Sequence, residues 1–144
     1  MENQNYKNHR RFVPMYHVFL FSLIILVIIG ACVNLIKSIG DHERIYSADL
    51  IFSLSIASLF GFFFMRTFAL KAQDRAIRSE ENLRHFVLTG KLLDSRLQVK
   101  QIVALRFAAD EEFVGLAKKA ADSNMAPEDI KKEIKNWKGD TYRA

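Results

Sequence analysis

Two long apolar segments dominate the first half of the chain. The stretch Phe12–Ile36 has 25 residues without Asp, Glu, Lys or Arg, and Leu50–Met65 has another 16. A helix of about 20 apolar residues crosses the roughly 30 Å of hydrocarbon in a bilayer. The first segment is apolar around its whole circumference, which is typical of a membrane span. The pattern therefore predicts an all-α membrane protein with two transmembrane helices, the first over residues 12–38.

The second apolar segment needs its flanks to cross a bilayer. Its 16 residues reach only about 24 Å at 1.5 Å per residue. Arg66 can extend its charged end to the headgroups, so we place the second span over residues 48–70. Ser47 is the expected N-cap of this helix. Residues 39–47 would then form a short loop between two spans arranged as a hairpin.

Small side chains recur along one side of the second span. Ser53, Ala57 and Gly61 follow one another at intervals of four, a spacing that lets two helices approach closely. These residues are our candidate helix-packing positions. Packing against the first span is one interpretation, and the seam of a homodimer or of a larger membrane-protein complex is the other.

Basic residues flank the spans unequally and indicate an orientation. The connector between the two apolar segments, residues 37–49, holds the basic residues Lys37 and Arg44 and three acidic residues. The remaining basic neighbours of the spans are Lys7, Arg10 and Arg11 before the first, and Arg66, Lys71, Arg75 and Arg78 after the second. Because cytoplasmic flanks are enriched in Lys and Arg, we expect both termini to be cytoplasmic. Residues 1–11 are then a basic cytoplasmic N-terminus, and residues 39–47 an external loop.

The basic residues after the second span have a second interpretation. Arg66, Lys71, Arg75 and Arg78 are candidate contacts to anionic lipid headgroups, since each such side chain near a membrane surface gains roughly 1 kcal/mol. Topology alone also explains them. In either case the expected partner is the lipid bilayer.

The charge balance changes sharply after Met65. The final 79 residues carry 16 of the 21 basic and 12 of the 16 acidic side chains. Good helix formers continue without Pro or Gly as far as Gly90, which is typical of a helix end, so residues 71–90 are predicted to extend the second span into the cytoplasm. A thin apolar stripe follows this extension, formed by Phe68, Ala72, Ala76, Leu83 and Phe86/Val87. Such a stripe needs a cover, which is either the following helices or a second copy of the chain.

About three short helices are expected in residues 91–144, which would form a small cytoplasmic helical domain. The first covers Val99–Phe107, Asp110 is the expected N-cap of the second, and the third runs from Pro127 to Gly139. Each has an apolar face that must be buried. The aromatic and branched residues on these faces are candidates either for a core or for a surface that binds another protein: Phe113, Ile130, Ile134 and Trp137.

Several motifs resemble those of a known family. They are Gln4-Asn-Tyr-Lys-Asn-His9, Pro14-Met-Tyr-His17, Phe68-Ala-Leu-Lys-Ala-Gln-Asp-Arg75, Leu88-Thr-Gly-Lys91 and Ala104-Leu-Arg-Phe-Ala-Ala-Asp-Glu-Glu-Phe113. Over nearly its whole length the chain is similar to an uncharacterised family of small two-pass membrane proteins found mainly in Bacteroidota, a domain of unknown function. The resemblance implies a bacterial inner (cytoplasmic) membrane and transfers no active site. Ala109 departs from the pattern, where a serine cap is expected.

Reactive groups are sparse. Cys32 is the single cysteine and, in Ile29-Gly30-Ala31-Cys32, also allows a lipoprotein signal, although the apolar run continues beyond it. Glu81 and His85 lie one turn apart but are too few for a zinc site, and we expect them to be a solvated pair. Residues 110–112 are acidic where a nucleic-acid-reading helix would be basic, so nucleic acid is an unlikely partner. We therefore assign no catalytic, cofactor-binding or metal-binding residue.

The function most consistent with this pattern is a non-enzymatic one. The chain would be a membrane-anchored scaffold or accessory subunit that acts through its cytoplasmic helical domain. The alternative is a membrane enzyme, or a transport or regulatory component, whose site is completed by oligomerisation or by a partner.

Overall fold

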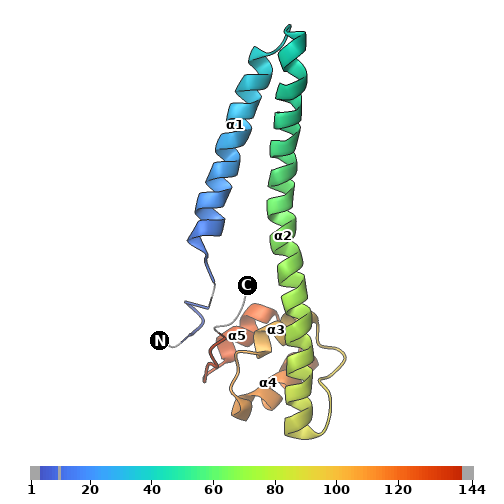
Figure 1. Ribbon diagram of the computed structural model, residues 1–144. Coiled ribbons are helices and arrows are strands. Elements are labelled where there is room, and N and C mark those ends of the chain that lie inside the picture. The colour runs from blue at the N-terminus through green and yellow to red at the C-terminus, as the bar shows by residue number, and fades with distance from the viewer. Residues whose placement is uncertain (1–3, 10, 141–144) are drawn as a thin grey trace. The chain divides into compact units, whose positions relative to one another are not determined.

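The computed structural model describes residues 4–9 and 11–140, and within them the chain is helical with no strand (Figure 1). The chain divides into two compact units, one of residues 12–68 and one that joins residues 1–11 to residues 69–144. Helix α2 contributes to both units. The elements are the π-helix η1 (Met15–Leu20) and the α-helices α1 (Phe21–Lys37), α2 (His42–Thr89), α3 (Val99–Leu105), α4 (Asp110–Asp122) and α5 (Pro127–Glu133).

The first unit is a helical hairpin. Helix α1 turns over Ser38–Asp41 into α2, which runs in the opposite direction (Figure 1). Gly40 makes the turn with φ of +92°, a value that suits glycine. The carboxylate of Asp41 accepts hydrogen bonds from the N–H groups of Glu43 at 3.1 Å and Arg44 at 3.3 Å, and so caps α2.

The prediction that Ser47 caps this helix is wrong. Helix α2 begins five residues earlier, at His42. The hydroxyl of Ser47 lies inside the helix and donates to the carbonyl oxygen of Arg44 at 2.9 Å. Asp41 provides the cap instead, because its side chain reaches two orphan N–H groups at the turn.

Two helical stretches are long and apolar enough to cross a membrane. They are Met15–Lys37 and a window within His42–Thr89. Most of their large apolar side chains are exposed, including Leu26 at 65% and Leu54 at 68%. Exposure of this extent would be very costly in water.

Helix α2 turns a narrow face towards α1. Ala48, Ser55 and Phe62 are buried at intervals of seven residues, the repeat of a coiled-coil seam. Near the open end of the hairpin, Tyr16 stacks on Phe62 with ring centroids 4.3 Å apart, and its hydroxyl donates to the Phe62 carbonyl oxygen. Aromatic stacking and one hydrogen bond therefore hold this end.

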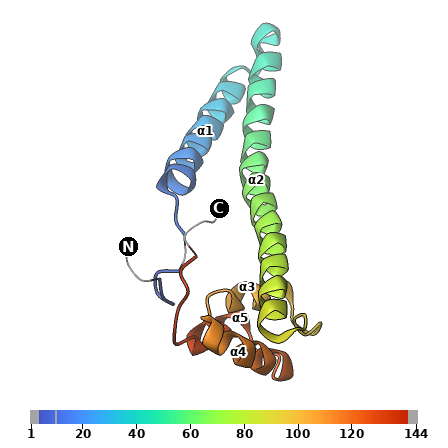
Figure 2. The ribbon, with the colours of Figure 1, turned by 60° about the horizontal axis from the view of Figure 1, so that its bottom comes forward.

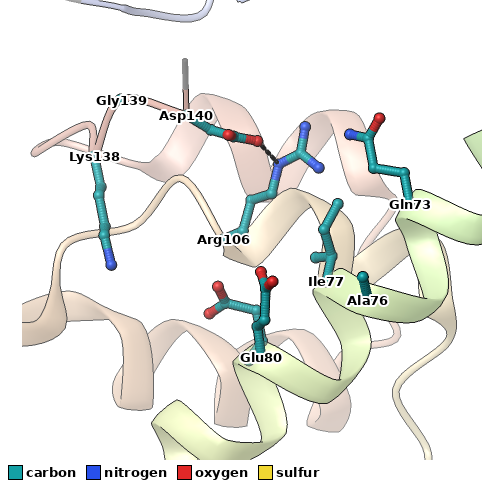
Figure 3. Close-up of a pocket in the computed structure, with 9 residues that line it drawn as sticks. Gln73, Ala76, Ile77, Glu80, Arg106, Lys138, Gly139 and Asp140 are labelled. Atoms are coloured by element: carbon teal, nitrogen blue, oxygen red, sulfur yellow. Dashed lines mark ion pairs between the residues drawn. The ribbon is translucent and has the colours of Figure 1, made fainter. Parts of the chain in front are cut away.

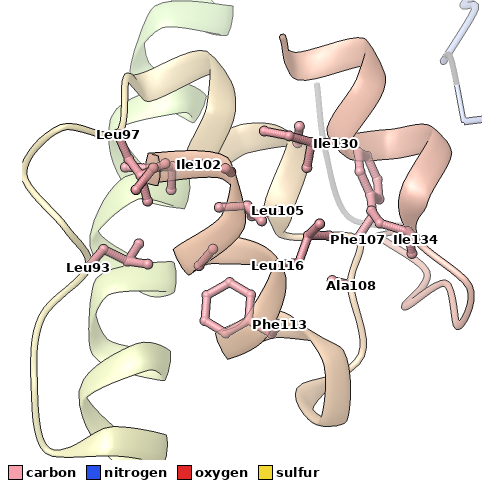
Figure 4. Packing of buried hydrophobic residues seen from close by; sticks show 14 residues of the cluster. Leu93, Leu97, Ile102, Leu105, Phe107, Ala108, Phe113, Leu116, Ile130 and Ile134 are labelled. Atoms are coloured by element: carbon pink, nitrogen blue, oxygen red, sulfur yellow. The ribbon is translucent and has the colours of Figure 1, made fainter. Parts of the chain in front are cut away.

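The second unit is a helical domain built on the last turns of α2, around which α3, α4 and α5 gather (Figure 2). Helix α2 ends at Thr89, and Gly90 follows with φ of +73°, as the sequence predicts. Leu93 and Leu97 fold back from the next loop into the core (Figure 4). The core contains Leu93, Leu97, Ile102, Ala104, Leu105, Phe107, Ala108, Phe113, Leu116, Ala117, Ala120, Ala121, Ile130 and Ile134.

The domain covers a different face of α2 from the apolar one. The buried residues of α2 in this unit are Ile77 and Glu81. Leu83, Phe86 and Val87 are 63%, 50% and 75% exposed. The following helices therefore leave most of the predicted stripe open, and the cover expected from them is not provided within one chain.

Two helix boundaries differ from the sequence prediction. Helix α4 has Ala109 at its N-cap, without a side-chain hydrogen bond, and Asp110 is its first residue instead of its cap. Helix α5 starts with Pro127 as expected but ends at Glu133, well before Gly139. Trp137 consequently does not lie on the α5 face.

Trp137 belongs to a short extended segment. It forms an isolated antiparallel bridge with Ala108. The N–H of Ala109 donates to Asn136 at 3.1 Å, and the N–H of Lys138 donates to Phe107 at 2.7 Å. These bonds satisfy backbone groups beside the core that a longer helix would have paired internally.

The N-terminal tail packs against this domain and belongs to the same unit. His9 is 8% exposed, with its ring 5.8 Å from that of Trp137 and 5.9 Å from that of Phe107. The Tyr6 hydroxyl donates to the Glu128 carboxylate at 3.2 Å. The tail before α1 and the domain after α2 are thereby connected.

Candidate functional site

A polar cavity of the helical domain lies between α2, the end of α3 and the segment after α5 (Figure 3). It has a volume of about 350 Å³. Its lining residues are Gln73, Ala76, Ile77, Glu80, Glu81, Arg106, Lys138, Gly139 and Asp140. None of these carries a hydroxyl, thiol or imidazole, and the polar groups that line the cavity are carboxylates, an amine, a guanidinium and an amide, which can hold a ligand by charge and hydrogen bonding.

Ion pairing largely balances the charges of this cavity. The guanidinium of Arg106 is 3.2 Å from the carboxylate of Asp140 (Figure 3). The Arg106 guanidinium also lies 4.6 Å from the centre of the Phe107 ring. Glu81 pairs with Arg84 of the next turn at 3.0 Å. These internal partners stabilise the fold and leave Glu80 and Lys138 as the side chains with no ion pair to a described residue.

Arg84 is the centre of a second polar cluster, between α2 and α4. It donates to Asp110 at 2.7 Å and to the carbonyl oxygen of Ala108 at 2.7 Å, and its guanidinium lies 4.2 Å from the centre of the Phe113 ring. With its bond to Glu81, this planar group satisfies several acceptors at once, as arginine is suited to do. The Arg84 hydrogen bond lowers the pKa of Asp110 below its ordinary value.

The Glu81–His85 pair of the sequence analysis does not form. Glu81 is 7% exposed, not solvated, and turns to Arg84. The Nδ1 atom of His85 lies 2.7 Å from the Lys91 carbonyl oxygen. In the part of the chain that the structure describes, no three His, Cys, Asp or Glu side chains gather as a metal site would require.

The four candidate anchors of the last helices lie in or against the core. Phe113 and Ile130 are fully buried, and Ile134 is 6% exposed. Trp137 is half-buried at the edge of the core and packs on Phe107 with ring centroids 5.0 Å apart. The remaining face of its ring lies near His9 of the tail.

The small-residue ridge of α2 does not face α1. Ser53 and Ala57 are exposed, and a Cβ added to Gly61 would meet no atom within 4 Å. The face buried in the hairpin is that of Ala48, Ser55 and Phe62, roughly a third of a turn or more away. The ridge is open in this chain.

The candidate lipid contacts fall into both units. In the hairpin, the Arg66 guanidinium lies 5.8 Å from the centre of the Tyr16 ring. In the other unit, Lys71, Arg75 and Arg78 are exposed along one side of α2. Arg78 lies about 12 Å along the helix from Leu70, which is beyond a Debye length of about 8 Å at physiological salt. Lys71 is therefore better placed than Arg78 to attract lipid.

A shallow apolar groove of about 350 Å³ follows the exposed side of α2 next to α4. Leu83, Val87 and Leu88 contribute its apolar surface, and Glu80, Arg84 and Asp110 its polar rim. The groove lies on the uncovered stripe, so it is a candidate contact surface of this unit.

Sequence reasoning missed three functional contacts of the domain. Helical spacing suggests a pair of Arg84 with Glu80, but Arg84 pairs with Glu81 and also with Asp110 and Ala108, which are more than twenty residues away in the chain. The acidic triplet was assigned to capping, but the carboxylate of Glu112 accepts the N–H groups of Lys135 and Asn136. The motif that ends at His9 was the one available signal for the tail, and it gave no indication of what His9 contacts.

Comparisons with known proteins return one family. A family model described as "Family of unknown function (DUF6526)" matches residues 1–144. No curated protein and no solved structure matches the chain. The resemblance to a domain of unknown function, drawn from the sequence motifs, is confirmed, while the biochemical role has to be inferred from geometry.

Proposed function

The chain belongs to DUF6526, a family of unknown function, and we propose that it is an integral protein of the bacterial inner membrane that anchors a cytoplasmic helical domain. In this proposal it is a non-enzymatic scaffold or accessory subunit. The hairpin of residues 12–68 is the anchor, and the helical domain is the part that meets other proteins.

The exposed apolar surface of the hairpin is the observation that carries this proposal. Large apolar residues on both α1 and the first half of α2 are open to the surroundings, and both stretches have the length of a span. A hairpin that small cannot bury these residues within itself. A bilayer covers them without any further protein.

Two observations support an orientation with both ends in the cytoplasm. The tail before α1 packs on the domain after α2 through His9 and Tyr6, so both ends lie on the same side. The connector between the spans holds two basic residues, Lys37 and Arg44, whereas three precede the first span and four follow the second directly. The positive-inside rule then assigns the domain to the cytoplasm.

The pairing of charges within the domain, together with its exposed apolar residues, supports a binding role over a catalytic one. Its polar clusters are satisfied by pairs such as Arg84 with Asp110 and Arg106 with Asp140. Its exposed apolar residues lie instead on the open side and end of α2, with Leu92 of the next loop 66% exposed. An apolar patch on an otherwise closed domain marks a contact surface.

Two measurements test the proposal. First, washing the membranes with alkaline carbonate should leave the chain in the membrane pellet, and release into the supernatant would contradict the anchor.

Second, the tagged chain is cross-linked in its own membranes, purified in mild detergent and analysed by mass spectrometry. A chain that ends at Lys71 keeps both candidate spans and is the control. Proteins captured by the whole chain and lost from the control support the scaffold role, and identical captures contradict it.

A further inference from the structure

The uncovered stripe of α2 in the helical domain unit is regular. Its exposed members Ala72, Ala76, Leu83 and Phe86, with the exposed Ser79 between them, follow one another at alternating intervals of four and three residues. This is the a/d repeat by which two helices pack side by side. The domain buries another face of the helix, at Ile77 and Glu81, and leaves the side chains of this repeat exposed, although Ala76 also lines the edge of the polar cavity and Leu83 the apolar groove.

We propose that a second copy of this chain covers the stripe, in a parallel two-helix seam over residues 72–86 of α2. In this register Ala76 and Leu83 are a positions, and Ala72, Ser79 and Phe86 are d positions. The small residues let the helices approach in the first part of the seam, and the large apolar residues fill it in the second.

Charge complementarity across the seam favours a second copy of the chain as the partner that covers the stripe. The register puts Arg75 at a g position and Glu80 at the next e position, and both side chains are exposed. In a parallel pair, each g residue faces the e residue of the following heptad on the other helix, so Arg75 meets the partner's Glu80 and Glu80 meets the partner's Arg75. An antiparallel pair would lose these matched contacts.

Membrane anchoring provides the direction and the concentration that so short a seam needs. Helices of about 15 residues with alanine or serine at three of five seam positions associate weakly when free in solution. Two copies inserted the same way in one membrane present α2 in parallel and at high effective concentration. The parallel direction therefore rests on the proposed membrane anchor, whereas the heptad register and the charges do not.

Cysteine cross-linking in reconstituted lipid bilayers tests the seam. A two-fold parallel seam brings each d position against its own copy, so Ser79→Cys in a Cys32→Ala background should form a dimer-linking disulfide under mild oxidation. Arg78→Cys in the same background is the matched control, since it is one residue away, exposed and outside the seam. Linking at position 79 and not at 78 is expected. Equal linking, or none, in chains that are inserted in the bilayer would overturn the seam.

Charge exchange gives a second, independent readout. Arg75→Glu should weaken dimerisation by about tenfold, because two symmetric contacts change from attraction to repulsion. Glu80→Arg should do the same, and the double exchange should restore dimerisation. Circular dichroism and the fluorescence of Trp137 check that each variant is folded. Failure to insert into the bilayer would count against the proposed anchor, whereas insertion as a monomer would count against the seam alone.

Discussion

At the residue scale, Arg84 connects α2 to α4 and to the segment before it in the helical domain. It is 12% exposed and is the ion-pair partner of Glu81, which is itself buried. Arg84→Leu leaves that carboxylate buried without a cation, so we expect the free energy of unfolding to fall by about 3–5 kcal/mol. Denaturation followed by Trp137 fluorescence measures the loss.

Matched variants separate the loss of the buried ion pair from the general effect of replacing an arginine of α2. Glu81→Leu added to Arg84→Leu should recover most of the stability, since the unpaired carboxylate is then removed. Arg78→Leu, on an exposed site of the same helix, should change the free energy of unfolding little. A loss for Arg78→Leu equal to that for Arg84→Leu would contradict the role given to this cluster.

The lowered pKa values of three carboxylates in the domain predict that the fold loses stability in acid. Arg96 lowers the pKa of Asp94 to about 2, Arg84 lowers the pKa of Asp110, and Lys131 lowers that of Glu128. Carboxylates with a lowered folded-state pKa stabilise the fold above their unfolded pKa of about 4, and this contribution disappears as pH falls through the folded value.

The melting temperature of the domain should therefore be level from pH 7 to about pH 5 and decline from about pH 4 towards pH 2. Asp110→Asn should lower the plateau and make the decline shallower, because Arg84 then has one carboxylate fewer to lose. A melting temperature that rises on acidification would be inconsistent with these pairs.

His9 provides a residue-scale test of the tail contact. Its ring lies 5.8 Å from the ring of Trp137, the single tryptophan of the chain. His9→Ala should expose the indole and shift its emission to longer wavelength, while Lys7→Ala, an exposed neighbour, should leave the emission in place. An unchanged spectrum for His9→Ala would mean that the tail does not cover Trp137.

At the element scale, the two faces of α2 in the hairpin should respond differently to added volume. Ala48 is completely buried, so Ala48→Leu should overpack the hairpin and cost about 1–3 kcal/mol. Gly61→Leu meets no atom within 4 Å of its Cβ and should leave the thermal stability of the hairpin in detergent unchanged. The opposite ranking of the two variants would mean that α1 packs on the small-residue ridge.

The elements themselves could be predicted from the sequence where local chemistry decides them. Gly90 and Pro127 are at the helix end and helix start that their conformational preferences favour. The start of α2 was misplaced because Ser47 is of a residue type that favours caps, whereas Asp41 at the turn makes the capping hydrogen bonds. The end of α5 was misplaced because pairing of residues 136–138 with the segment after α3 replaces the last helical turn.

At the scale of the whole molecule, ion pairs between residues far apart in the sequence determine which face of α2 the domain covers, and the sequence pattern did not indicate these pairs. The apolar stripe left open whether the following helices or a second copy would cover Leu83 and Phe86, and the domain packs on Ile77 and Glu81 instead. Glu81 can be buried because Arg84 neutralises it, and Arg84 is held in turn by Asp110 of α4. Periodicity counts apolar residues and has no access to such partners. The same limit concealed the contact between the tail and Trp137.

The central claim is that a membrane hairpin holds the N-terminal tail and the helical domain on the cytoplasmic side. Its most direct test is a pair of topology reporters, one inserted at Asp41 in the turn between α1 and α2, and one fused to the C-terminus. We expect a reporter active only in the cytoplasm to work at the C-terminus and not at Asp41, and a reporter active only outside to do the reverse. Cytoplasmic activity from the Asp41 insertion would contradict it.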